Sequence, residues 1–147
     1  MKEETLEIKG YVCTYDGDVF LEEKKQDRDH YYPDTDSIGS IVADHFSEIA
    51  KGVDVSLHDW TRGTMRMISN VFCRYYISDT PIEWDAIVEE HVKKMTGALQ
   101  TEDRCAGYSE YTITESWTEL FVGGHDLRNE LLEHKGKYVI VRIDYKI

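Results

Sequence analysis

The chain has 147 residues, a common size for one domain and enough for a hydrophobic core without disulfides or metals. Ten tyrosines, four phenylalanines and three tryptophans argue against disorder. The net charge of −12, from 29 acidic and 17 basic residues, disfavours direct nucleic-acid binding, because phosphates require clustered cations. The only paired bases are Lys24-Lys25 and Lys93-Lys94. We therefore expect one domain over residues 1–147.

Cysteine usage and hydropathy predict a cytoplasmic location. The three cysteines are an odd number without C-x-x-C spacing, which favours free thiols in a reducing compartment. The N-terminal segment MKEETLEIKG lacks the apolar core of a signal peptide. No apolar run approaches the ~18 residues needed to cross a bilayer, so we expect no membrane partner.

The first third of the chain predicts a hairpin followed by a helix. Two strands, 6–15 and 19–25, flank an Asp-Gly pair that favours a tight turn. Residues 26–36 predict a polar, acidic loop. Apolar residues then recur at helical spacing over 38–49, with Asp36 or Ser37 as cap and Gly52 as terminator.

The middle third predicts a second hairpin and a long helix. Alternating residues indicate strands at 53–57 and 65–78. Thr80-Pro81-Ile82-Glu83 has the form of a capping box with proline at the first helical position. The apolar positions that follow form one stripe, which predicts a helix over 81–99: Trp84, Ile87, Val88, His91, Met95 and Leu99.

The last third predicts a loop at 100–107, a strand or bent hairpin over 108–122, a short helix over 126–134 and a strand over 138–145. Gly123-Gly124 and Gly136 mark the breaks between these elements. The order is ββ-α-ββ-α-β-α-β. We therefore predict an α+β fold, with a mostly antiparallel sheet and about three helices packed on one face.

Catalytic and metal-binding signatures are missing from the sequence. It contains no G-x-S-x-G elbow, phosphate-binding loop or G-x-G-x-x-G motif. The six histidines show no H-x-H or H-E-x-x-H spacing, and the acidic loop does not fit an EF-hand. Cys105 follows Arg104 but has no local base. We expect no catalytic residue, metal or cofactor, and a binding protein rather than an enzyme.

The densest group of interesting side chains lies between residues 108 and 126. Backbone amides of a Gly-Gly turn that enters a helix can bind an anion, and nearby aromatic rings can stack on a planar ligand. The plainer alternative is a strand with aromatic pairs, a glycine turn and an aspartate cap. The candidate ligand-binding residues are Tyr108, Glu110, Trp117, Gly123, Gly124, His125 and Asp126.

Three short segments in the C-terminal third carry a resemblance. SEYT at 109–112, GGHDL at 123–127 and GKY at 136–138 resemble small proteins of unknown function from phages and mobile elements of Gram-positive bacteria. The resemblance covers roughly residues 108–143. It implies a genomic context that favours host-interaction or anti-defence roles, and it assigns no residue a role.

The charge distribution favours a protein partner with a basic surface. Residues 1–36 contain 11 acids and 5 bases, so half of the net charge lies in a quarter of the chain. We expect an acidic module that docks on a basic surface of a host protein. Two alternatives are a small-molecule or nucleotide-binding protein, with its site in residues 108–126, and an assembly subunit. The sequence gives no indication of the oligomeric state.

Overall fold

A computed structural model describes residues 3–15, 17–25, 33, 35–52, 57–58, 65–108 and 113–146, which form one antiparallel sheet with two helices. The order in the sheet is β2-β1-β8-β4-β5-β6-β7, and β3 pairs with β4 outside this path. The strands are β1 (Glu3–Tyr15), β2 (Asp18–Glu22), β3 (Leu57–His58), β4 (Met65–Ser78), β5 (Lys93–Tyr108), β6 (Ile113–Val122), β7 (His125–Asp126) and β8 (Tyr138–Lys146). The helices are α1 (Ile38–Gly52) and α2 (Leu127–Leu132), and two 3₁₀ turns span Trp84–Ala86 and Glu89–His91.

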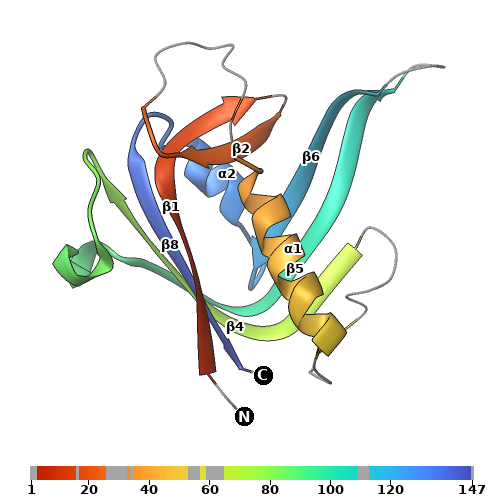
Figure 1. Ribbon diagram of the computed structural model, residues 1–147, viewed down its shortest axis with the longest axis horizontal. Helices are drawn as coiled ribbons and strands as arrows, with labels where there is room; N and C mark the ends of the chain where they lie inside the picture. The colour runs from red at the N-terminus through yellow and green to blue at the C-terminus, as the bar shows by residue number, and fades with distance from the viewer. Residues whose placement is uncertain are drawn as a thin grey trace.

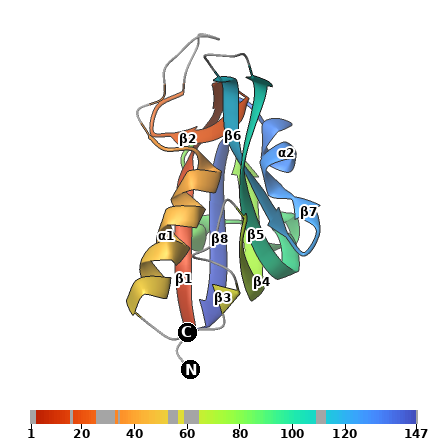
Figure 2. The ribbon, with the colours of Figure 1, turned by 90° about the vertical axis from the view of Figure 1, so that its right-hand side faces the viewer.

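The sheet bends into a trough that wraps around α1 (Figure 1). In the side view, α1 lies to the left and α2 to the right of β6 and β8, and both helices contact β2 and β6 (Figure 2). Strands β2 and β6 stand far apart in the strand order, yet the curvature brings them into contact at one end. The trough is therefore partly closed by its own edges.

A bulge and a glycine allow the long central strands to bend. The β4–β5 register shifts between Ile68 and Val71, which marks the bulge. Opposite it, Gly97 has φ +133°, and a Cβ there would lie 2.7 Å from the Cα of Gly123. A side chain at position 97 would therefore block the approach of the β6–β7 turn to β5.

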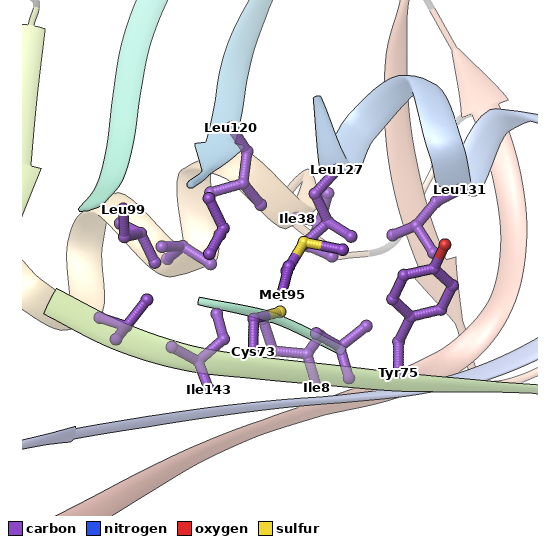
Figure 3. Packing of buried hydrophobic residues seen from close by; sticks show 14 of the residues in the cluster. Ile8, Ile38, Cys73, Tyr75, Met95, Leu99, Leu120, Leu127, Leu131 and Ile143 are labelled. Carbon is purple, nitrogen blue, oxygen red and sulfur yellow. The ribbon is translucent and has the colours of Figure 1, made fainter. Parts of the chain in front are cut away.

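The core fills the inside of the trough (Figure 3). Val42 and Phe46 of α1 and Leu131 of α2 are fully buried against it. Opposite them, alternate residues of the central strands point inward, as the two-residue period of a strand requires. These include Cys73, Leu99, Leu120, Val141 and Ile143.

The predicted order ββ-α-ββ-α-β-α-β is wrong, because the structure has two helices rather than three. The expected helix over 81–99 is replaced by two 3₁₀ turns and the start of β5. Met95 and Leu99 are both buried as predicted, but a spacing of four residues returns to the same face of a strand as well as of a helix. The stripe therefore did not discriminate between the two structures.

The expected capping box does not form. Glu83 bonds the Nζ of Lys9, at 3.0 and 3.1 Å, instead of returning to the backbone of Thr80. The predicted loop at 100–107 is also wrong, because these residues continue β5. Strands β5 and β6 form one long hairpin, whose pairing runs from Leu99–Val122 to Tyr108–Ile113.

Several other elements are confirmed. The first hairpin, the helix that starts at Ile38, the strand 65–78 and the last strand occur at or near the expected positions. The short second helix is also confirmed, with Asp126 as its cap. The predicted strand at 53–57 falls mostly outside the described residues, as does most of the acidic loop at 26–36.

Candidate functional site

The residues predicted to bind a ligand are spread from the end of β5 to β7 rather than gathered. Trp117 lies in the middle of β6, whereas Gly123 and Gly124 form the turn at its end. Gly123 lies six positions after Trp117, roughly 20 Å at the usual rise of a strand. Tyr108 ends β5 toward the opposite end of the hairpin, and Glu110 lies outside the described residues.

Two of these residues have local structural partners. Asp126 caps α2, since its Oδ1 accepts a hydrogen bond from the backbone N–H of Asn129 at 3.0 Å. The Nδ1 atom of His125 lies 3.7 Å from a carboxylate oxygen of Glu130. Residues 123–132 therefore match the plainer alternative, a glycine turn followed by a capped helix. This helix, α2, is only six residues long.

Trp117 belongs to a different cluster, at the end of the trough where β2 and β6 meet. The guanidinium of Arg128 lies 5.5 Å from the centroid of the Trp117 ring. A guanidinium nitrogen of Arg128 donates a hydrogen bond to the carbonyl oxygen of Gly17. Arg128 is 9% exposed, and its Nε has no hydrogen-bond partner among the described residues.

The carboxylate of Asp18 joins the two edges of the sheet at this end. One oxygen accepts the backbone N–H of Val19 at 2.8 Å, and the other accepts that of Thr118 on β6 at 2.9 Å. Burial raises the pKa of Asp18, and these two hydrogen bonds, Ser37 and Arg128 oppose that shift. We call Asp18, Thr118 and Arg128 the edge clasp. It explains how strands distant in the sheet order stay together.

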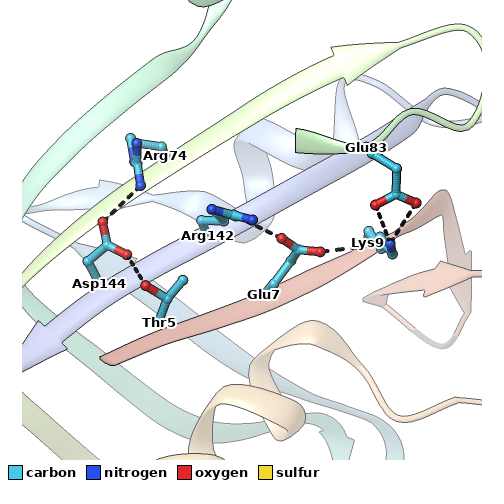
Figure 4. A network of polar contacts seen from close by, with 7 residues as sticks. All are labelled: Thr5, Glu7, Lys9, Arg74, Glu83, Arg142 and Asp144. Carbon is cyan, nitrogen blue, oxygen red and sulfur yellow. Dashed lines mark hydrogen bonds and ion pairs between the residues drawn. The ribbon is translucent and has the colours of Figure 1, made fainter. Parts of the chain in front are cut away.

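The convex face of the sheet carries a chain of charged contacts (Figure 4). Arg74 pairs with Asp144 at 2.9 Å, and Asp144 also accepts from Thr5. Arg142 pairs with Glu7 at 2.7 Å. These pairs cross β1, β8 and β4, so they support the register of the three strands, although each partly exposed pair contributes little.

Trp84 ties the β4–β5 connection to this charged face. Its ring lies 5.0 Å from the guanidinium of Arg74 and 4.9 Å from that of Arg142. Cation–π contacts of this kind contribute about 0.5–1 kcal/mol each when partly exposed. Lys9 adds an ion pair to Glu83, next to Trp84 in the chain. The connection is thus held at its first 3₁₀ turn.

The connection itself, residues 79–92, is the feature that sequence reasoning missed. It projects from the sheet as a bent arm, drawn in green at the left of Figure 1. We call it the acidic arm, because it has five acidic residues and no lysine or arginine. All five are exposed: Asp79, Glu83, Asp85, Glu89 and Glu90. A charge count over 79–92 could have found it, but the expected helix concealed the pattern.

An exposed apolar side chain lies in the same segment as these acidic residues. Among the described residues, Val88 is the one large hydrophobic side chain classed as exposed, at 45%. It lies between the two 3₁₀ turns of the acidic arm. The turns are closed by backbone hydrogen bonds, including His91 N–H to the carbonyl of Val88 at 3.0 Å. Val88 is therefore presented on a defined backbone.

Titratable groups that are wholly or partly buried pack in or beside the core. The Nε2 of His45 lies 2.8 Å from the hydroxyl of Tyr145, and burial lowers the pKa of His45. Burial raises the pKa of the Cys73 thiol to about 12, which keeps it protonated. In the part of the chain that the structure describes, no three His, Cys, Asp or Glu side chains are grouped to hold a metal ion.

No family model, curated protein or solved structure matches the chain. Among the described residues, no helix is both long enough and apolar enough to span a membrane. The fold and its surfaces define a small antiparallel α+β domain with a projecting acidic arm.

Proposed function

We propose that this protein is an acidic protein-binding module that uses its acidic arm to dock on a basic surface of a partner protein. The observation that carries the proposal is the exposed Val88 in a segment that has five exposed carboxylates and no lysine or arginine. Interfaces commonly combine an apolar centre with a polar rim, and charge complementarity accelerates encounter.

The charge of the arm is only partly neutralised within the molecule. Asp79, Glu83 and Glu89 pair with lysines elsewhere in the chain. Asp85 and Glu90 have no ion pair within the described part of the molecule. A basic partner would therefore find free carboxylates on both sides of Val88.

The contacts of Trp84 and Lys9 hold the arm in place before a partner arrives. Preorganisation of this kind reduces the conformational entropy lost on binding. The resemblance to phage and mobile-element proteins makes host proteins the first partners to search. A nucleotide site at 108–126 has weaker support, since Trp117 lies in the middle of β6 and the glycine turn follows the end of that strand.

The test compares two triple variants as baits in bacterial lysate. The arm variant combines Asp85→Asn, Glu89→Gln and Glu90→Gln, and the control neutralises three exposed carboxylates elsewhere, Glu23→Gln, Asp36→Asn and Asp44→Asn. Both lower the negative charge equally. We expect the wild type and the control to retain the same basic protein at low salt, and the arm variant to lose it.

Salt supplies the second readout. Binding to the purified partner should weaken markedly between about 0.05 and 0.3 M salt, because screening shortens the range of the attraction. Equal retention by both variants, or recovery of no protein by the wild type at low salt, would overturn the proposal.

A further inference from the structure

A cleft of about 330 Å³ opens far from the acidic arm, where β8 ends. Its walls include Glu3 of β1, Ile68, Asn70 and Phe72 of β4, Thr96 of β5 and Lys146 of β8. The volume falls at the lower end of the range for small-molecule sites. The strand pairing explains why space remains there.

The cleft is a gap in the sheet. Strands β3 and β8 pair with the same edge of β4, because β5 occupies the other edge. The pairing with β3 ends at Ile68 and that with β8 begins at Phe72, so the bulge between them faces no described strand on that edge. Asn70 stands exposed in this gap.

Two opposite charges stand side by side at the mouth of the cleft. Glu3 and Lys146 are direct cross-strand partners, and both are exposed. Cβ atoms of such partners lie roughly 5 Å apart. Yet neither side chain bonds another residue in the described ranges. Asp144, the other carboxylate of the cleft, is already held by Arg74 and Thr5.

The wall beside these charges is apolar. Ile68 is buried and Phe72 is half-buried, and the guanidinium of Arg74 lies 5.2 Å from the centroid of the Phe72 ring. That contact restricts the ring from one side. The cleft thus offers a free anion, a free cation and an apolar surface within the span of one small molecule.

We propose that the cleft binds a free α-amino acid with a large apolar side chain. Its ammonium faces Glu3, its carboxylate faces Lys146, and its side chain packs against Phe72. An α-amino acid fits because it carries one ammonium and one carboxylate on a single carbon, so that each group can reach one of the two adjacent side chains. Exposed charges bind weakly, so we expect a dissociation constant of about 1 mM.

The test is a nuclear magnetic resonance titration of the ¹⁵N-labelled protein with phenylalanine. We expect saturable shifts at the Asn70 side-chain amide and at the end of β8. N-acetylphenylalanine and phenylalanine amide each lack one charge and should bind at least about tenfold more weakly, as should glycine. Equal binding by the blocked forms, or no saturable shift, would overturn the proposal.

Three substitutions locate the site. Thr96→Trp should fill the cleft and abolish binding, since position 96 is exposed on a strand and tolerates an aromatic residue. Lys146→Gln and Glu3→Gln should each weaken binding severalfold, while the matched exposed changes Lys93→Gln and Glu23→Gln should not. If Thr96→Trp fails to fold, Lys146→Gln and Glu3→Gln still test the proposal. Unchanged phenylalanine binding in both Lys146→Gln and Glu3→Gln would contradict the proposed site.

Discussion

The carboxylate of Asp18 stabilises the contact between β2 and β6. It satisfies two backbone N–H groups on different strands, one of them on the far edge of the sheet. Asparagine has almost the same shape but offers only one acceptor oxygen. One of the two N–H groups would face an amide nitrogen instead.

We therefore expect Asp18→Asn to lower the free energy of unfolding by about 1–3 kcal/mol, the usual cost of an unsatisfied buried polar group. Urea denaturation measures this, with the exposed Asp36→Asn as the control that should stay within about 0.5 kcal/mol of the wild type. An unchanged free energy of unfolding in Asp18→Asn would show that the edge clasp does not hold β2 and β6 together.

His45 predicts a pH dependence. Burial holds its folded-state pKa below 6.5, so between the folded and unfolded pKa values the unfolded chain binds a proton that the folded chain does not. Stability contributed by neutral His45 is complete above pH 6.5 and is lost as pH falls through its folded pKa. Glu4 opposes the shift.

Denaturation midpoints between pH 7.5 and 5 should accordingly decline less in His45→Gln than in the wild type. The ring is partly solvated, so the difference should stay below about 1 kcal/mol. His91→Gln changes an exposed histidine and should follow the wild-type curve. Parallel curves for His45→Gln and the wild type would rule out this assignment.

At the scale of elements, the contact between α1 and β6 depends on the absence of a side chain at Gly39. A Cβ there would lie 2.5 Å from the carbonyl oxygen of Thr118. That neighbour is backbone and cannot move without displacing β6 and its hydrogen bond to Asp18.

We expect Gly39→Ala to destabilise the protein by at least about 2 kcal/mol, despite the higher helix propensity of alanine. Gly124→Ala is the contrast, because a Cβ at position 124 meets nothing within 4 Å and only the φ of +85° is unfavourable. Its cost should be about 1–2 kcal/mol. Thermal unfolding ranks the two, and a stabilised Gly39→Ala would contradict the close packing of α1.

The segment 80–99 shows why its helix could not be excluded from sequence. Threonine, proline and glutamate at 80, 81 and 83 satisfy the local rules for a helix start. Glu83 instead pairs with Lys9, which is 74 residues away in the chain. The β5 strand then gains partners on both sides, and tertiary pairing overrides the local preference.

For the whole molecule, the net charge of −12 predicts a response to salt. At 0.01 M salt the screening length is about 30 Å, so the excess carboxylates repel one another across the domain; at 0.15 M it is about 8 Å. The exposed ion pairs lose some attraction, but each contributes little. We expect the melting temperature to rise by a few degrees between these conditions.

Scanning calorimetry in sodium chloride measures this rise. A control series at a pH near the isoelectric point of 4.8 should show a smaller rise, because the net charge is close to zero there. A melting temperature that falls with salt at neutral pH would mean that the ion pairs of the convex face outweigh the repulsion.

Elements with local sequence signals are the ones that could be predicted. The Asp-Gly hairpin, the helix that starts at Ile38, the strand 65–78 and the capped helix after Gly124 depend on turn chemistry, capping and periodicity within a few residues. Among the candidate ligand residues, the cap formed by Asp126 was predictable for the same reason.

The remaining features depend on contacts between distant elements. The contact of β2 with β6, the contacts of Trp84 with two arginines and the pairing of Glu3 with Lys146 join residues from separate elements of the chain. Strand pairing places Glu3 beside Lys146, and the curvature of the sheet, which the close packing at Gly97 permits, brings β2 to β6. Those forces act between segments, so no window of the sequence contains them.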